Sequence, residues 1–423
     1  MNKCRKCIIA LIVILIPLSY STKFLIGLPD ITWINPTLIL SVLFCLCTLD
    51  IKIDSPSVFI VLMAFFSAIV GYIITPDWKL SLYPLFRESV RLLLCVIFMH
   101  VMIYALTKNR EYVLKCLSIT VCLEFFFSIY LIIGAYSDLG LSGDAREYMR
   151  IYLYRQAIWI NGDIMIPRPG GTFIESPIYG LFMICSYIIL TISRKEYIYD
   201  NRLIKTGQYI AMIGAIISLS SQVIAGLAVF WIYPILKQLF VRKQRNIKYI
   251  GYTIIGIVCS FYYLLDRTII KIREINNIDI SLIGFSLGER IFHIYYSLQI
   301  ITDNLLLLLF GIGPGRYGTY LSKIFNVAED TGIQVVPMDW LAETGMIGLS
   351  IIIFWLYNIY YNGKKKYCTL AEAGFFATLI SVLFQANWRW ECWFFVWALM
   401  LSKNNSKVVG GINGQKKNSF YSA

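Results

Sequence analysis

Residues 311–348 read GIGPGRYGTYLSKIFNVAEDTGIQVVPMDWLAETGMIG, and this stretch passes from a Gly- and Pro-rich loop into an apolar run. The loop holds a single arginine, Arg316. Two acidic residues, Asp339 and Glu343, lie where the apolar run starts. Residues 349–361 continue the run with almost wholly apolar side chains. The stretch therefore predicts a place where an aqueous loop meets a membrane span, and we expect the functional residues here.

The composition of the whole chain is that of a membrane protein. Of the 423 residues, 58% are hydrophobic and only 15% are charged, and the mean hydropathy is +0.67. A water-soluble domain could not carry this composition on its surface. In a membrane protein the net charge of +13 first indicates topology, because Lys and Arg mark cytoplasmic loops, so nucleic acid is not an expected partner.

Hydrophobic runs long enough to cross the bilayer recur along the chain and predict an all-α polytopic fold with about 12 transmembrane helices and both termini cytoplasmic. Basic flanks on both sides of residues 207–240 indicate that this run crosses twice, with a turn at Ser218–Gln222. Residues 1–402 form the single membrane domain, and residues 403–423 a polar, disordered tail. The expected spans are residues 8–20, 31–49, 57–75, 90–107, 113–136, 173–193, 207–220, 222–240, 249–265, 342–361, 368–386 and 389–402.

This topology leaves two large extracytoplasmic loops, residues 137–172 and 266–341, and the amphipathic pattern over 280–310 predicts interfacial helices in the second. Cations expected inside are mostly Lys, whereas those expected outside are mostly Arg. The planar guanidinium binds phosphate in a bidentate way, so an outer arginine cluster suits a pyrophosphate. Pairing with outer acids or lipid phosphates is the alternative. The outer arginines are Arg87, Arg91, Arg146, Arg150, Arg155, Arg168, Arg267, Arg273, Arg290, Arg316 and Arg389.

Several of these residues stand in patterns that predict a site. Arg146, Arg150 and Arg155 precede the segment PRPGGTFIESP at 167–177, in which Arg168 lies at the water–lipid boundary near a helix N-terminus. The same segment is also a simple turn followed by a helix start. On the interfacial helix, Arg290 is a better candidate than His293, since a lone histidine is more often a surface or packed side chain.

Acidic residues offer a second set of candidates. Asp339 and Glu343 lie four residues apart on one helical face, where they could act as a general base, orient an acceptor hydroxyl, or cap the helix. Glu124 lies inside a span, where a hydrogen-bonded structural role is favoured over a coupling-ion role. The sequence contains two histidines, no HExxH motif and no Walker A motif, so we expect neither a metal nor a cofactor.

The order of motifs carries a resemblance. Arg-Pro-Gly-Gly-Thr-Phe at 168–173, the Ser-rich break at 218–222 and Gly-Glu-Arg at 288–290 come first. Gly-Ile-Gly-Pro-Gly at 311–315 and Ala-Glu-Thr-Gly at 342–345 follow. This order resembles the O-antigen polymerase (Wzy) and O-antigen ligase superfamily of bacterial inner-membrane glycan assembly. The likeness covers about residues 168–361 in motif order and the whole chain in topology.

The resemblance implies a metal-independent glycosyltransferase that joins undecaprenyl-pyrophosphate-linked repeat units at the outer face of the inner membrane. It implies catalytic roles for Arg168 and Arg290, which would hold the pyrophosphate, and offers Arg316 as a further candidate for binding it. It also implies a chain-length regulator and a flippase as partners. Ligases of this superfamily carry a His-Asn pair before the Glu-Thr-Gly segment. Residues 334–340 lack a histidine, which favours the polymerase, with Asp339 as a substitute base. Ligase and lipid-linked oligosaccharide flippase are the alternatives.

Overall fold

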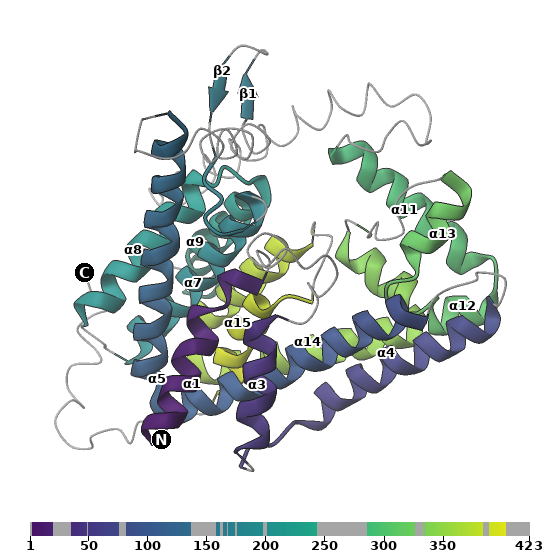
Figure 1. The fold of residues 1–423 in the computed structure, drawn as a ribbon, viewed down its shortest axis with the longest axis horizontal. Helices are drawn as coiled ribbons and strands as arrows, with labels where there is room; N and C mark the ends of the chain where they lie inside the picture. The colour runs from purple at the N-terminus through teal and green to yellow at the C-terminus, as the bar shows by residue number, and fades with distance from the viewer. Residues whose placement is uncertain are drawn as a thin grey trace.

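The computed structural model describes the chain in segments, and within them it is helical apart from one short antiparallel ribbon (Figure 1). The ribbon pairs β1 (Ile158–Ile160) with β2 (Ile164–Ile166), and Trp159 lies opposite Met165. The described residues are 2–19, 35–48, 50–75, 82–136, 158–160, 164–166, 168–173, 176–197, 201–242, 286–325, 333, 335–383 and 389–402.

The helices follow one another with short connections wherever both ends are described. Four of them begin at an asparagine whose side-chain oxygen accepts a backbone N–H of the first turn, namely Asn2, Asn35, Asn201 and Asn304. The elements are α1 (Lys3–Ile14), η1 (Pro17–Ser19), α3 (Pro36–Leu46), α4 (Ser55–Ile74), α5 (Leu82–Tyr136), α7 (Ser176–Tyr197), α8 (Arg202–Ile217), α9 (Ser221–Arg242), α11 (Ser286–Thr302), α12 (Leu305–Phe310), α13 (Tyr317–Phe325), α14 (Val336–Val382) and α15 (Glu391–Leu401).

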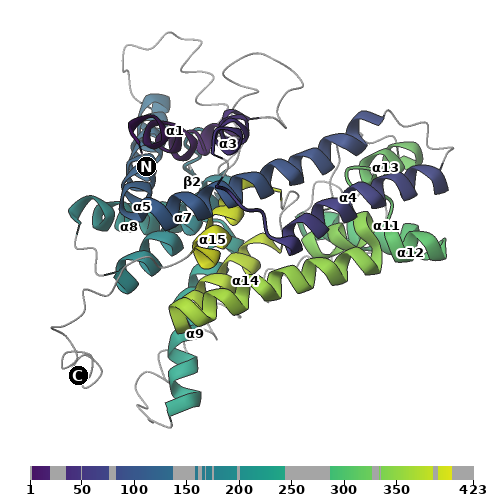
Figure 2. The same cartoon turned by 90° about the horizontal axis from the view of Figure 1, so that it is seen from below.

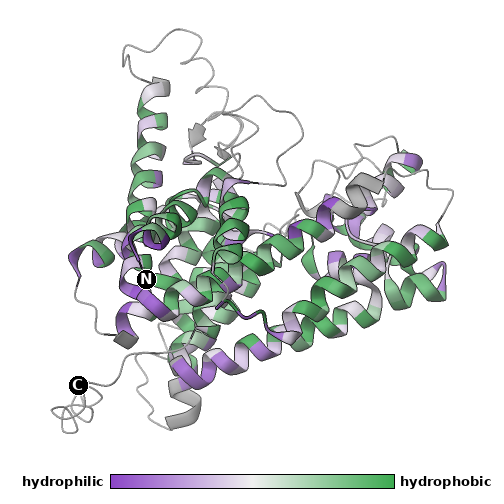
Figure 3. Ribbon diagram, turned by 60° about the horizontal axis from the view of Figure 1, so that its bottom comes forward, coloured by the Kyte–Doolittle hydropathy of each residue, from purple (hydrophilic) through white to green (hydrophobic). Residues whose placement is uncertain are grey.

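Long apolar helices identify the chain as a helical membrane protein. Within the described residues, four stretches are long and apolar enough to cross a bilayer: Ser55–Ile74, Arg87–Gly134, Ser176–Lys195 and Val336–Lys366. Large apolar side chains face outward on them, including Phe59 and Ile73 on α4 and Phe354 on α14. In Figure 3 the ribbons of these helices are coloured as apolar over most of their length. Such surfaces suit lipid rather than water.

The two longest helices each change direction along their length. In α5 the backbone leaves the helical region at Asn109, with φ −155° and ψ 66°. In α14 the amide of Val336 donates to the carbonyl of Leu383 over 3.0 Å, so the two ends of one 47-residue helix meet. A straight helix of that length would be about 70 Å long. Helix α14 is therefore a pair of antiparallel arms, whereas α5 bends sharply at Asn109 (Figure 1). The arms of the two helices contain the expected spans 90–107, 113–136, 342–361 and 368–386.

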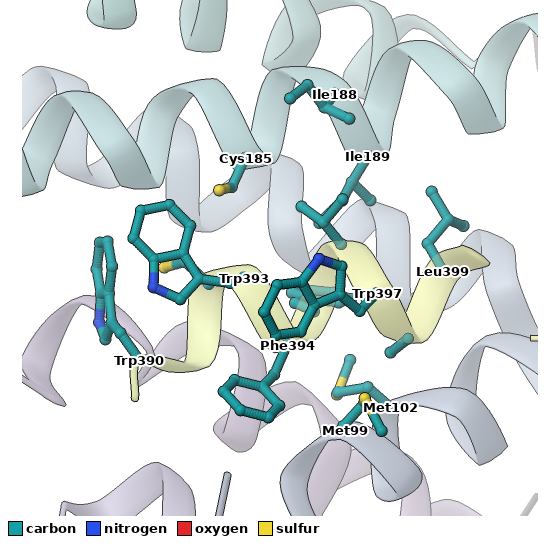
Figure 4. Packing of buried hydrophobic residues seen from close by; sticks show 14 of the residues in the cluster. Met99, Met102, Cys185, Ile188, Ile189, Trp390, Trp393, Phe394, Trp397 and Leu399 are labelled. Carbon is teal, nitrogen blue, oxygen red and sulfur yellow. The ribbon is translucent and has the colours of Figure 1, made fainter. Parts of the chain in front are cut away.

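Helix α15 lies at the centre of the bundle. Every residue from Glu391 to Met400 is buried. Figure 4 shows Trp393 and Trp397 packed between Cys185 and Ile189 of α7 and Met99 of α5. The side of the molecule away from α8 is formed by α4 and by arms of α5 and α14, which run toward α11, α12 and α13 (Figure 1, Figure 2).

The remaining span predictions are met to different degrees. The run 207–240 is divided at Ser218–Ser220 into α8 and α9, as the flanking charges predict. The expected span 31–49 is represented by the shorter α3. The expected span 249–265, most of the loop 137–172 and the tail 403–423 lie outside the described residues.

Replacing Trp397 by alanine tests the central position of α15. The indole is 1% exposed, so its removal should lower the free energy of unfolding by about 3–5 kcal/mol. Denaturant titration in detergent measures this change. Phe126→Ala is the matched control, because Phe126 is 61% exposed on α5. An equal loss in both variants would contradict the central packing of α15.

Candidate functional site

A buried ion network joins three helices at one end of the bundle. The guanidinium of Arg389, which precedes α15, pairs with the Glu343 carboxylate of α14 and with Glu88 Oε2 of α5 at 3.3 Å. Arg91 Nε donates to the backbone carbonyl of Arg389 over 3.0 Å, and Arg87 Nε lies 3.0 Å from Glu88 Oε1. All except Arg87 are buried. The network fixes where α5, α14 and α15 meet.

The carboxylates around Arg389 determine its protonation. Burial alone would lower the pKa of Arg389, but Glu343, Glu88 and Asp339 together raise it above its ordinary value. Arg389 is therefore a permanent cation already matched by acids. A buried charge of this kind is tolerated only when it is paired and hydrogen-bonded.

The Gly-rich loop 311–316 docks on the first turns of α14. The amides of Ile312 and Gly313 donate to the carbonyls of Ala342 and Glu343 over 2.8 and 3.0 Å. The amide of Gly315 donates to Glu343 Oε1 over 2.9 Å. Glu343 thus binds the loop with one carboxylate oxygen and Arg389 with the other.

Two glycines make this docking possible. Gly345 has φ +66° inside α14 and Gly311 has φ +78°, a region that other residues rarely adopt. A Cβ on Gly345 would lie 2.4 Å from the carbonyl of Leu309, and a Cβ on Gly311 would lie 2.4 Å from that of Glu343. The motifs at 311–315 and 342–345 are therefore two halves of one backbone contact.

Arg316 lies at the end of this loop and is 1% exposed. Its guanidinium is 3.4 Å from the carbonyl of Ile312 and 3.5 Å from that of Thr75, at the end of α4. Burial lowers its pKa to about 10, with a small opposing effect from Tyr72. The side chain remains charged at neutral pH in a poorly solvated place.

Arg290 and His293 lie one turn apart on α11. Burial lowers the pKa of Arg290, and the neighbouring Glu289 partly opposes this. His293 is fully buried, and its Nδ1 lies 3.0 Å from the Tyr317 hydroxyl. Burial lowers the pKa of His293 to about 4, so the imidazole is neutral at physiological pH.

Asp339 and Glu343 are both buried on α14, at 5% and 3% exposure. Asp339 is in the first turn, where a carboxylate complements the helix dipole. Its charge also helps to raise the pKa values of Arg389 and Tyr317. Both carboxylate oxygens of Glu343 are already bonded, to Arg389 and to the amide of Gly315, which favours an anchoring role for Glu343. Asp339 remains the better candidate for a base.

The segment 168–173 forms a second polar cluster. Arg168 Nε donates to the carbonyl of Ser218 over 2.7 Å, at the break between α8 and α9. The amide and hydroxyl of Thr172 donate to the carboxylate of Glu124 over 3.0 and 2.9 Å. Gly171 has φ +56° and lies against Glu124. Glu124 is therefore the hydrogen-bonded anchor of this turn, which agrees with the structural interpretation.

One aromatic contact joins the two clusters. The rings of Phe173 and Trp390 meet edge to face with centroids 6.0 Å apart, and Trp390 follows Arg389 directly. The structure thus connects the Arg168 segment to Arg389, and through Glu343 to the loop of Arg316. Arg146, Arg150 and Arg155 lie outside the described residues.

The central residue of the network was not among the predicted site residues. Arg389 and Glu88 are 301 residues apart, so no local spacing indicates the pair. The available signal was the placement of charges at the ends of apolar runs, where an unpaired charge is costly.

An apolar groove on the surface of the helix bundle lies next to a small cavity that reaches this network. Its volume is about 530 Å³, and it lies between α4 and α14, lined by Phe59, Met346, Ile347 and Phe354 among others. A smaller cavity shares Ile351 with the groove and is lined by Pro314, Thr344 and Arg389. Within the described residues, no group of His, Cys, Asp and Glu is arranged to hold a metal ion.

Gly345→Ala should disrupt the docking of the loop on α14. The left-handed backbone and the overlap with Leu309 together predict a loss of about 2–5 kcal/mol in the free energy of unfolding. Gly363→Ala is the control in the same helix, because its Cβ would meet only the Met400 side chain at 3.2 Å. Denaturant titration that ranks Gly363→Ala as the more damaging change would refute this contact.

His293 predicts a pH dependence of stability. Its pKa is about 4 in the folded protein and about 6.5 when unfolded. The unfolded state therefore binds the proton more readily, and stability is lost as pH falls from about 6.5 to 4. The full effect is about 3 kcal/mol. His293→Asn should flatten this slope relative to the wild type in unfolding titrations at pH 7, 5.5 and 4.5; parallel slopes would show that His293 is not buried in its neutral form.

No protein-family model and no curated protein sequence matches this chain.

Proposed function

We propose that this protein is a polymerase of O-antigen or capsular polysaccharide that joins undecaprenyl-pyrophosphate-linked repeat units. The proposal rests on one observation. Three of the segments that carry the resemblance lie next to one another, and Glu343, Arg389 and Trp390 connect them. These segments are residues 168–173, 311–316 and 342–345. Two of the segments bring an arginine, Arg168 or Arg316, to this end of the bundle.

Arginine predominates at one end of α15, whereas a lysine and an arginine lie at its other end. Arg87, Arg91 and Arg389 lie near the N-terminal end of α15, and the loop that carries Arg316 is bound there through Glu343. At its C-terminal end, Lys366 Nζ donates to the Leu401 carbonyl over 2.6 Å, and Arg110 donates to Ser402. This distribution supports a cytoplasmic side at the C-terminal end of α15 and an outer side at the arginine-bearing end. The proposal keeps about 12 spans, cytoplasmic termini and a bacterial inner membrane as its topology.

The apolar groove supports a lipid-linked substrate. It opens on the lipid-facing side between α4 and α14, and the small cavity beyond it is lined by Arg389 and by Pro314 of the Arg316 loop. A polyprenyl chain suits the apolar groove, and its pyrophosphate suits the arginine-rich end.

The proposed reaction needs no metal. The acceptor-sugar hydroxyl attacks the anomeric carbon of the donor, a new C–O bond forms, and the bond from that carbon to the pyrophosphate oxygen breaks. Arg168, Arg290 and Arg316 stabilise the charge that develops on the leaving pyrophosphate. Asp339 takes the hydroxyl proton as general base.

The proposed substrate surface extends beyond the reacting atoms. Further arginines add to this basic surface, namely Arg146, Arg150 and Arg155. A chain-length regulator and a flippase are expected partners.

Complementation of a gene deletion tests this function. The host lacking the gene should carry core bearing a single repeat, and the wild-type gene should restore the ladder of surface glycan on a gel. Arg168→Ala, Arg290→Ala and Asp339→Ala should restore less than about one tenth of the polymer, since a lost charge-stabilising contact reduces rates by about 100-fold or more.

Each other outcome assigns a different function. Polymer that stays on the lipid carrier identifies the ligase, and loss of all repeats outside the cell identifies the flippase. An unchanged ladder refutes a role in this glycan. Arg87→Ala is the matched arginine control, because Arg87 pairs with Glu88 at the partly exposed edge of the network.

A further inference from the structure

A hydrogen bond between α11 and α13 connects the segments that carry Arg290 and Arg316. His293 of α11 has 0% exposure, and its Nδ1 lies 3.0 Å from the hydroxyl of Tyr317, the first residue of α13. The same hydroxyl is 3.3 Å from the His293 carbonyl. Tyr317 is itself 2% exposed. A buried polar pair in such a position defines geometry, because either group would be costly to leave without the other.

The state of the imidazole sets the direction of this bond. With a pKa of about 4, His293 carries one ring proton at neutral pH. Glu289 Oε1 lies 3.7 Å from Nε2, and this negative charge favours the tautomer with the proton on Nε2. Nδ1 then accepts from the Tyr317 hydroxyl, whose single proton is shared between Nδ1 and the His293 carbonyl. The contacts between His293 and Tyr317 thus join α11 to α13.

The His293–Tyr317 bond holds the backbone of Arg316 from one side while α14 holds it from the other. The carbonyl of Arg316 accepts the amide of Tyr320 over 3.2 Å, so Arg316 begins the first turn of α13. The preceding residue, Gly315, is bound to Glu343. Arg290 lies one turn before His293 on α11. The His293–Tyr317 bond therefore fixes the Arg316 loop against the helix that carries Arg290.

We propose that His293 and Tyr317 are positioning residues that set the relative placement of Arg290 and Arg316 for the pyrophosphate of the lipid-linked donor. This inference rests on the proposed function. Neither residue needs to touch the substrate. A pyrophosphate presents two linked phosphate groups, so two guanidinium groups bind it well only when their separation is held in advance.

The test measures binding of undecaprenyl pyrophosphate to the full-length protein in lipid nanodiscs. Tyr317→Phe keeps the ring and removes the hydroxyl, and it should weaken binding about five- to tenfold, as expected for one lost hydrogen bond. His293→Leu should do the same, whereas His293→Asn, whose amide can replace Nδ1, should recover most of the affinity. Tyr295→Phe is the control, because the Tyr295 side chain of α11 is 47% exposed.

A double-mutant cycle separates positioning from general loosening. Arg316→Ala should cost much less affinity in the Tyr317→Phe background than in the Tyr295→Phe background, because the arginine is already misplaced. Equal costs, or Tyr317→Phe binding as well as Tyr295→Phe, would overturn the inference while leaving the proposed function intact. A wild-type protein that does not bind the lipid would instead refute the proposed function, and the inference with it.

Discussion

Arg389, buried between the carboxylates of Glu88 and Glu343, is the interaction on which the end of this bundle depends. Its position requires α5, α14 and the start of α15 to meet at one point, and its main chain is held in turn by Arg91. Loss of one partner from such a pair leaves an uncompensated buried charge, which costs about 3–5 kcal/mol. Apolar residues could hold these helices equally well, so the network matters chiefly for defining one arrangement of them.

That arrangement explains why Gly-rich segments recur in this chain. The loop at 311–316 can approach α14 only because Gly311 and Gly345 take left-handed backbone conformations without a side chain. The turn at 168–173 meets Glu124 through Gly171 in the same way. Both contacts satisfy backbone groups that would otherwise be buried without hydrogen bonds. The glycines thus serve the packing of backbone on helix, and the arginines beside them are positioned as a result.

Much of the fold follows from periodicity and charge, but the site does not. Apolar run length predicts the helices, and the basic flanks of 207–240 predict the division between α8 and α9. Because an acidic side chain inside a membrane span is costly unless it is hydrogen-bonded, the sequence also predicts hydrogen bonds to Glu124. No local rule pairs Glu88 with Arg389 or Arg168 with the Ser218 carbonyl, because these contacts join residues far apart in the chain. His293 ranks below Arg290 as a candidate in the sequence, but the structure buries its imidazole against Tyr317 and so gives it a role in packing.

The arginines at this end of the bundle differ in what surrounds them, and this difference indicates which of them binds an anion. Carboxylates raise the pKa of Arg389, so an additional anion there would compete with Glu88 and Glu343. Burial dominates at Arg316 and Arg290 and lowers their pKa values. A nearby dianion would stabilise the charged form of both, and binding would recover part of the desolvation cost that folding imposes on them. Arg389 therefore organises the site, whereas Arg316 and Arg290 are placed to gain from a pyrophosphate.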